Sequence, residues 1–369
     1  MRNVTIITKR ITVLLLAIIL IHLTEYSFSV NVDYKAENKK STSNKNERIM
    51  LVRNDEEKRV DIFIDGKPFT SYIYPETLEK PVLFPIYTSR GTVITRGFPL
   101  EPRAGERVDH PHHIGCWFNY GDVNGLDFWN NSYKIPEEKK DEYGTIRHRE
   151  IRNIISGKNK GILEVTMDWL KYDKTPVLTE ETRFIFRSTQ NTRVIDRITK
   201  LTALDEEVFF KDNKEGLIAI RMDRTFETPS DKPEIFTGAN GNPTKVPVLN
   251  NEGVNGLYRS SEGLEGGDVW GTRAGWVSLS AKKGEELISI AIIDHPENQG
   301  YPTYWHARGY GLFSANNLGQ KIFSNGKREL NFKLQAGESV IFKHRILVHS
   351  GSHLTDEELN DSFDEFSSK

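Results

Sequence analysis

Short runs of β-branched and aromatic residues, separated by Gly, Asn, Asp and Lys turns, dominate the chain from Ile49 onward. Along 161–169 apolar and polar residues alternate in part, the pattern of a strand that buries one face. A helical period is almost absent. The pattern predicts strands at 60–64, 82–87, 93–96, 145–155, 161–170, 180–187, 193–204, 217–223, 275–281, 287–293, 310–314, 329–335 and 339–348.

Turn residues predict how some of these strands connect. Asp65 and Gly66 predict a hairpin after the first strand, and residues 336–338 predict another between the last two. The Gly-, Asn-, Pro- and Ser-rich stretch 229–273 predicts a long excursion between strands, of the kind that forms lids or binding loops. So many closely spaced strands predict an all-β fold, a large antiparallel β-sandwich forming a single domain over 49–350.

Only the C-terminal region, 351–369, has a convincing helical pattern. Thr355 and Glu358 have the spacing of a capping box, and Leu359, Phe363 and Phe366 follow at helical spacing. We therefore expect a short terminal helix that packs on an edge of the sandwich.

The first 29 residues predict a secretory signal. Three basic residues precede an apolar run at 11–23, and small residues allow cleavage near Ser29. The alternative is a retained membrane anchor, but the run is shorter than the roughly 20 residues of a spanning helix. We expect an exported protein, periplasmic or extracellular, with no membrane association once the signal is removed. Residues 30–48 are polar and predict a flexible leader.

Composition narrows the function classes. The chain has 369 residues, 37% of them hydrophobic, which is enough for a full core. Its 50 basic and 52 acidic residues nearly balance, so there is no nucleic-acid footprint. Cys116 is the only cysteine, which excludes an intramolecular disulfide and predicts a buried, inert thiol. Phosphate-binding loops and a nucleophile elbow are absent, so nucleotide chemistry and serine hydrolysis are poorly supported.

The densest candidate chemistry is the histidine run at 110–113. In an extended segment, His110 and His112 would point to one face and His113 to the other. Two histidines at this spacing can share a metal ion or transfer protons in a sugar pocket. The alternative is that they only hydrogen-bond neighbouring loops.

Three further residues follow closely. Asp122 and Asp127 lie among turn signals, where carboxylates can orient an imidazole, bind hydroxyls or ligate a cation, although turn formation is an equal alternative. Trp129 offers a flat face for a sugar ring, or plain packing.

A second cluster lies just before a buried strand. Lys211, Asp212, Lys214 and Glu215 form a turn of alternating charge, which is commonly only solvated. In a loop at a strand end, however, such residues can act as an acid or base with a tuned pKa.

A third cluster lies near the C-terminal end of the sandwich. His306 sits in a short aromatic strand in which Trp305 faces the opposite side, and His295 precedes them. A buried histidine with satisfied hydrogen bonds is the alternative for His306. Arg273, at the end of the glycine-rich excursion, is a candidate for binding a hydroxyl or carboxylate.

Several of these motifs together resemble one family, DUF6807, which has also been labelled methane oxygenase (PmoA)-like. The residues that carry the resemblance are PIYT at 85–88, TRGFP at 95–99, the stretch 109–129, KDNKEG at 211–216, DHP at 294–296, PTYWH at 302–306 and VHSG at 348–351. The resemblance spans roughly 50–350. It implies a secreted bacterial protein of carbohydrate metabolism with a galactose-mutarotase-like supersandwich. An oxygenase subunit would need spanning helices, which the chain lacks after the signal.

These observations favour an exported carbohydrate-active enzyme, an epimerase, lyase or hydrolase, with no cofactor. His112 or His113 and His306 would handle protons, and Glu215 or Asp212 would be the counter-base. The expected substrate-binding residues are His110, Asp122, Asp127, Trp129, Lys211, Lys214, Arg273, His295 and Trp305. One alternative is a metal-dependent enzyme with a divalent ion on His110, His112 and His306, and another is a non-catalytic glycan-binding module.

Overall fold

The structure is a computed structural model that describes residues 48–368, and these residues build two eight-stranded sheets. The predicted signal (1–29) and all but the last residue of the predicted leader (30–48) lie outside the described residues. The first sheet has the strand order β1 (Ile49–Asn54), β2 (Arg59–Ile64), β3 (Lys67–Ile73), β4 (Val82–Ile86), β5 (Cys116–Tyr120), β11 (Gly216–Arg221), β16 (Leu312–Asn316) and β15 (Tyr304–Arg308).

The second sheet contains the longer strands. Its order is β12 (Leu257–Ser260), β13 (Trp276–Lys283), β14 (Glu286–Asp294), β18 (Ser339–Ser350), β9 (Thr192–Ala203), β8 (Pro176–Ser188), β7 (Gly161–Leu170) and β6 (Thr145–Ile155). A small third sheet pairs β10 (Val208–Phe210) with β17 (Phe332–Leu334). Neighbouring strands are antiparallel, as in β9 and β18. The predicted all-β antiparallel sandwich is confirmed.

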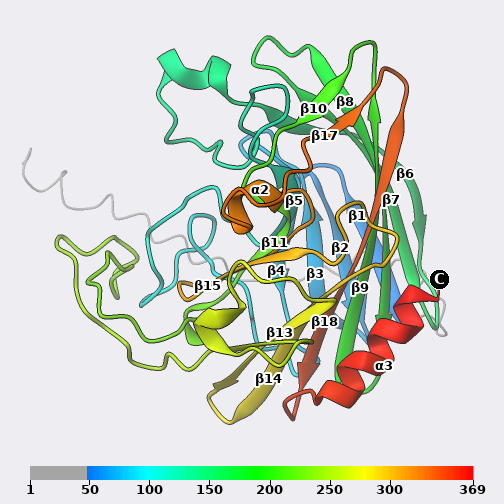
Figure 1. Cartoon of the computed structure of the whole chain (residues 1–369). Helices are drawn as coiled ribbons and strands as arrows, with labels where there is room; N and C mark the ends of the chain where they lie inside the picture. The colour runs from blue at the N-terminus through cyan, green and yellow to red at the C-terminus, as the bar shows by residue number, and fades with distance from the viewer. Residues whose placement is uncertain (1–47, 369) are drawn as a thin grey trace, which may run out of the picture. The chain divides into compact units, whose positions relative to one another are not determined.

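Side-chain alternation on the first sheet separates the core from the functional face. Phe118, Ile218 and Phe313 point toward the second sheet and belong to the main hydrophobic core. Their neighbours in sequence, Trp117 and Leu312, belong to a separate apolar cluster on the opposite face. In Figure 1 the cyan and yellow-green loops extend on this outer side of the first sheet. The outer face is therefore covered by loops rather than by another sheet.

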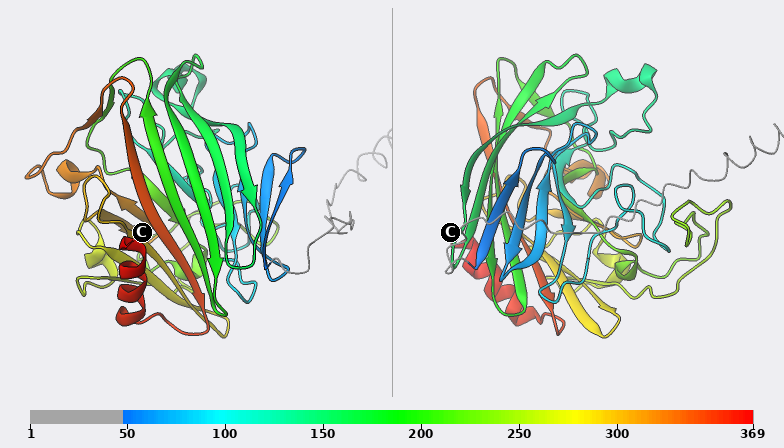
Figure 2. Two further views of the ribbon diagram at one scale, coloured as in Figure 1. Left: turned by 90° about the vertical axis from the view of Figure 1, so that its right-hand side faces the viewer. Right: turned by 180° about the vertical axis from the view of Figure 1, so that it is seen from behind.

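The terminal helix forms as predicted. In α3 (Asp356–Ser367) the Thr355 hydroxyl accepts from the Glu358 backbone N–H, and the Glu358 carboxylate accepts from the Thr355 backbone N–H. Leu359 and Phe366 pack on outward-facing residues of β13, β14 and β18. Figure 2 (left) shows α3 beside the long strands of the second sheet.

The remaining helical turns are short. They are α2 (Gln320–Phe323) and the 3-10 turns η1 (Glu137–Glu142), η2 (Arg224–Phe226) and η3 (Gly266–Val269). Within the described residues, no helix is long and apolar enough to cross a membrane. Burial raises the pKa of the Cys116 thiol to about 12, which fits the inert thiol expected from the sequence.

Three sequence predictions about local structure are wrong. Residues 93–96 make only isolated bridges, because Thr95 pairs with Met222 at a single position. The hairpin expected at 336–338 does not form, since β17 pairs with β10 whereas β18 pairs with β9 and β14. The excursion 229–273 contains a strand, β12, which extends the second sheet. The hairpin at Asp65 and Gly66 is confirmed, joining β2 to β3.

Candidate active site

The centre of the site is a row of side chains across the outer face of the first sheet. Trp117 on β5 pairs with Ala219 on β11, which pairs with Ser314 on β16, which pairs with His306 on β15. Arg221 lies two residues beyond Ala219 and so shares this face. The small Ala219 and Ser314 leave room above the sheet, and the surrounding loops place their functional groups over it.

The histidine run forms a tight turn and not the extended segment expected from the sequence. His110 has a φ of 40°, and the His113 backbone N–H donates to the His110 carbonyl at 3.0 Å. The His110 and His113 rings therefore stack, with centroids 4.8 Å apart, and the His112 ring lies 4.3 Å from that of His113. The prediction that His113 faces away from the other two is wrong.

A buried arginine shapes this turn. Arg96, only 1% exposed, donates to the carbonyl oxygens of Asp109 and His110 at 2.9 Å and of His113 at 3.0 Å. Three carbonyls converge on one guanidinium, which an extended strand cannot provide. The physical reason for the failed prediction is thus a tertiary contact.

Asp109 joins this arginine to a second one. Its carboxylate accepts from the Arg221 guanidinium at 2.6 Å and forms a close ion pair with Arg96. Burial alone would raise the pKa of Asp109, but the charges of Arg221 and Arg96 and the hydrogen bond from His110 hold it far below its usual range. The carboxylate therefore stays ionised and fixes both guanidinium groups beneath the histidines.

The contact with Arg221 sets the tautomer of His113. An Arg221 N–H lies 3.2 Å from His113 Nδ1. Because a guanidinium only donates, Nδ1 must accept and the proton must sit on Nε2. His113 Nε2 is buried without a hydrogen-bond partner in the structure. Burial lowers the pKa of His113 well below its usual value, so the ring stays neutral and presents an N–H donor.

His306 has the opposite tautomer. Its Nδ1 lies 3.0 Å from the Lys214 carbonyl oxygen, so Nδ1 carries the proton and Nε2 the lone pair. Glu215 Oε2 is 3.6 Å from the same Nδ1, and Glu215 also pairs with Lys214 at 2.9 Å. Burial and the charges of Lys214 and Arg308 lower the pKa of His306 to about 3, so the ring is neutral at pH 7.

Tyr310, Arg308 and Trp270 form a chain of contacts between the histidine turn and His306. The Tyr310 ring stacks on His110, with centroids 5.0 Å apart. Arg308 lies 5.8 Å from the Tyr310 ring centre and 5.4 Å from that of Trp270, and Trp270 is 6.5 Å from His306. Burial raises the pKa of Tyr310 to about 12, so its phenol keeps its proton. Segments distant in sequence therefore meet in one place.

A pocket opens beside these aromatic rings. It has a volume of about 630 Å³, and Trp270, Arg308 and Tyr310 line it together with polar residues of the loop at 228–234. Trp270 is 39% exposed, so part of its ring is accessible to a ligand. An accessible aromatic surface next to charged groups is typical of the lining of a ligand-binding pocket.

The structure places several predicted site residues in supporting positions. Asp122 accepts from the Gly125 backbone N–H at 3.0 Å and Asp127 from that of Trp129 at 2.8 Å, so both carboxylates hold turns. Trp129 is fully buried, 5.2 Å from Trp117. Of these residues, Trp129 contacts the histidine turn, with its ring centre 5.7 Å from that of His113.

The second cluster divides between two roles. Asp212 accepts three backbone N–H groups, from Lys321, Leu330 and Asn331, at 2.8 to 3.0 Å, and so anchors the segment that carries α2. Lys211 is exposed. Of the four predicted residues in this cluster, only Lys214 and Glu215 reach His306.

Three residues of the last cluster point elsewhere. Trp305 is buried in the core between the sheets and donates to the Ala274 carbonyl at 3.1 Å. Arg273 donates to the backbone carbonyls of residues 300–302. His295 packs on Phe366 of α3, with ring centroids 5.1 Å apart. Their expected roles in binding substrate are replaced by contacts that hold the fold.

Sequence reasoning missed Arg96, Arg221, Arg308, Tyr310 and Trp270. Two of these had a signal in the pattern. Arg221 ends the otherwise apolar run of β11, where a buried charge needs a partner, and Arg308 lies two residues after His306 and so shares its face. Tyr310 and Trp270 stand in loops, where no periodicity predicts their direction.

A metal site on His110, His112 and His306 is one alternative that the sequence allows. Across residues 48–368, no group of three or more His, Cys, Asp and Glu side chains is arranged to hold a metal ion. His112 Nε2 is buried without a partner, like His113 Nε2. Each of these unsatisfied imidazole nitrogens would be stabilised by a polar ligand group.

Comparison with known proteins places the chain in a family. The model of a family of unknown function, DUF6807, matches residues 59–364. The chain belongs to the DUF6807 family. The resemblance seen in the sequence motifs is thereby confirmed, and the matched region contains both the histidine turn and His306. A search of curated proteins finds no significant match.

Solved structures similar to this DUF6807 chain are distant in sequence. A GH36 α-galactosidase from Geobacillus stearothermophilus is 10% identical, with 82% of this chain and 41% of that chain covered and a TM-score of 0.39. A galactose mutarotase-like protein from Clostridium acetobutylicum is 12% identical, with 84% and 100% covered and a TM-score of 0.38. A putative aldose 1-epimerase from Escherichia coli K12 is 10% identical, with 82% and 99% covered and a TM-score of 0.35. The chain spans about two fifths of the length of the α-galactosidases it matches.

Proposed function

We propose that this protein is a carbohydrate-active enzyme that uses histidine and carboxylate groups for acid–base chemistry on a sugar or glycoside. The observation that carries the proposal is that two histidines lie next to the two aromatic residues that line one pocket: the His113 ring is 6.5 Å from Tyr310, and the His306 ring, which pairs with Glu215, is 6.5 Å from Trp270. These residues come from three distant parts of the chain. Export, expected from residues 1–29, belongs to the same proposal.

The two neutral imidazoles supply complementary groups. His306 presents a lone pair at Nε2, and His113 presents an N–H at Nε2. A sugar C–H or O–H proton transferred to His306 would leave an imidazolium, which Glu215 would stabilise from 3.6 Å. His113 and the Tyr310 phenol would donate to the oxygen on which negative charge develops.

The pocket suits a carbohydrate better than an apolar ligand. Trp270 and Tyr310 offer ring faces for the C–H side of a sugar, and Arg308 between them donates to hydroxyls. Epimerisation, elimination and glycoside cleavage all need a donor and an acceptor placed around one ring. The proposal therefore names the groups that donate and accept protons, and the reaction is one of these three.

The test is a screen of aldoses, uronic acids and oligosaccharides, with product followed by NMR and affinity by calorimetry, with and without chelator. We expect a turned-over sugar whose conversion is lost in His306→Gln and kept in His353→Gln, since His353 is an exposed histidine near α3. Binding without conversion by any sugar would replace the proposal with a glycan-binding module. Activity abolished by chelator would replace it with the metal-dependent alternative.

A further inference from the structure

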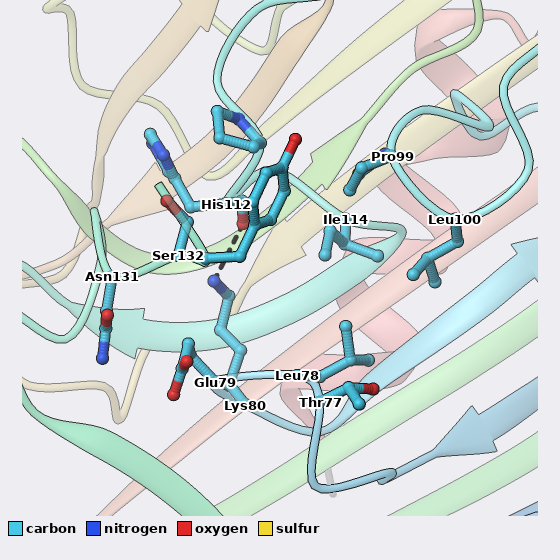
Figure 3. Close-up of a pocket in the computed structure, with 12 residues that line it drawn as sticks. Thr77, Leu78, Glu79, Lys80, Pro99, Leu100, His112, Ile114, Asn131 and Ser132 are labelled. Carbon is cyan, nitrogen blue, oxygen red and sulfur yellow. Dashed lines mark hydrogen bonds between the residues drawn. The ribbon is translucent and has the colours of Figure 1, made fainter. Parts of the chain in front are cut away.

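A second pocket lies on the other side of the histidine turn. It has a volume of about 280 Å³, and its walls include Leu78, Leu100, Ile114 and Ser132. His112 lines it as well, so this pocket and the site around His113 share one wall. Figure 3 shows Lys80 extending into the middle of the pocket, between Ile114 on one side and Ser132 on the other.

Lys80 is unusual because it is buried without a counter-ion. Lys80 is only 4% exposed. Among the described residues no carboxylate oxygen lies within ion-pair distance of its amine, and the neighbouring Glu79 pairs with Arg147 instead. The amine has one hydrogen-bond partner, the His112 carbonyl oxygen at 2.8 Å. Lysines are almost never buried unless they are paired, so this arrangement requires another explanation.

The surroundings favour an uncharged amine. Burial lowers the pKa of Lys80 to about 7, although the charges of Glu79 and Asp127 act in the opposite direction. The face of the Trp117 ring, with its centre 5.5 Å from the amine, likewise favours the ammonium form and so acts against burial. At neutral pH a large share of Lys80 is therefore the free amine, the form that attacks carbonyl carbon.

The same charges indicate what kind of ligand fits. Glu79, although paired with Arg147 at 3.1 Å, lines the pocket and acts on Lys80 as a negative charge together with Asp127, so a carboxylate ligand would meet like charge there. A protonated imine on Lys80 would instead be a cation stabilised by both. This distinguishes a neutral carbonyl compound from an anion.

We propose that Lys80 is a carbonyl-reactive amine and that this pocket binds a small aldehyde or ketone, such as an open-chain sugar, as an imine. The Lys80 nitrogen attacks the carbonyl carbon and forms a C–N bond. The two hydrogens of the amine leave with the carbonyl oxygen as one water molecule, and a C=N bond remains. The step needs no oxidant or reductant, and it does not depend on the acid–base chemistry proposed for His306.

Reductive trapping tests this proposal in the full-length protein. Glyceraldehyde with sodium cyanoborohydride at pH 7 converts an imine into a stable secondary amine, which peptide mass mapping locates. We expect Lys80 to be modified at least tenfold faster than the exposed Lys67 and Lys158, because an ordinary exposed lysine is almost wholly protonated at pH 7. The Lys80 rate should level off above pH 7 while the rates of exposed lysines keep rising.

A pocket-narrowing variant shows whether the reaction uses the pocket. Leu100 lines it and is 38% exposed, so Leu100→Trp should keep the fold and slow the trapping at Lys80 at least fivefold. Val52, 39% exposed on β1, gives the matched control Val52→Trp, which should leave the rate unchanged. Lys80 modified no faster than Lys67, or only after unfolding, would overturn the proposal. Neither result depends on turnover of a sugar, so failure here is distinct from failure of the proposed function.

Discussion

At the scale of single residues, removing the charge of Glu215 is the most direct test of the proposed reaction. Glu215→Gln keeps the size of the side chain and removes the charge 3.6 Å from His306. Because an imidazolium formed in the reaction then loses its stabilising partner, we expect kcat to fall about 100-fold with little change in KM. Steady-state kinetics on the sugar found in the screen measures this.

A similar pair elsewhere gives the control. Glu329 pairs with Lys321 at 2.8 Å on the surface, so Glu329→Gln should leave kcat unchanged. An unchanged kcat in Glu215→Gln would mean that this carboxylate does not assist His306.

Substitution of Asp109 tests how much the buried ion pairs below the histidine turn stabilise the protein. Asp109→Asn leaves the guanidinium groups of Arg96 and Arg221 without their shared negative charge. Since removing one partner from a buried ion pair leaves an uncompensated charge, we expect unfolding free energy to drop by about 3 kcal/mol. Urea denaturation measures it, with Asp65→Asn in the exposed Arg48 pair as control at less than about 1 kcal/mol. Equal losses in both variants would contradict this account.

At the scale of elements, the sequence predicted the long strands better than the short ones. The bounds of β6 and β7 match their predicted ranges, because each strand is long enough for turn signals and composition to define it. β10 and β12, of three and four residues, carry too little pattern to be recognised and form only by pairing with distant strands. The histidine turn failed for a related reason, since Arg96 imposes it from outside the segment.

The terminal helix offers a prediction about local stabilisation. In α3 the Thr355 side chain satisfies a backbone N–H that the helix start would otherwise leave without a partner. We expect Thr355→Ala to lower the unfolding free energy by about 1 kcal/mol. Asp361→Ala, an exposed change in the middle of the same helix, should stay within about 0.5 kcal/mol. Denaturant unfolding compares the two, and a neutral Thr355→Ala would show that the cap adds nothing once α3 is packed.

At the scale of the whole molecule, the site depends on strand order. β11 lies between β5 and β16, so residues near 117, 219 and 314 become neighbours on one face. Motif density pointed to His113, Glu215 and His306 separately, and strand alternation correctly placed Trp305 opposite His306. No local pattern specifies which strands pair across two hundred residues. The meeting of these groups therefore had to come from the structure.

The buried titratable groups predict how the stability of the whole molecule depends on pH. Burial lowers the pKa of His112 to about 2, of His306 and His344 to about 3 and of His148 to about 4, and it lowers the pKa of His113 well below its usual value. Below pH 6.5 each of these histidines is neutral in the folded protein and becomes protonated only when the protein unfolds. Each therefore lowers the free energy of unfolding by about 1.4 kcal/mol per pH unit as the pH falls. Burial raises the pKa of Asp294 to about 7, so its folded form binds the extra proton and its contribution grows as pH falls.

Five histidines outweigh one aspartate, so we expect stability to fall by up to about 6 kcal/mol per pH unit between pH 6.5 and 5. Thermal unfolding at pH 7.5, 6 and 5 measures the trend as a decreasing Tm. In Asp294→Asn the compensating proton is gone, and the decrease should be steeper. In His306→Gln one opposing group is gone, and the decrease should be shallower. A Tm that rises toward pH 5, or slopes that both variants leave unchanged, would show that these side chains are hydrated and titrate as they do in the unfolded chain.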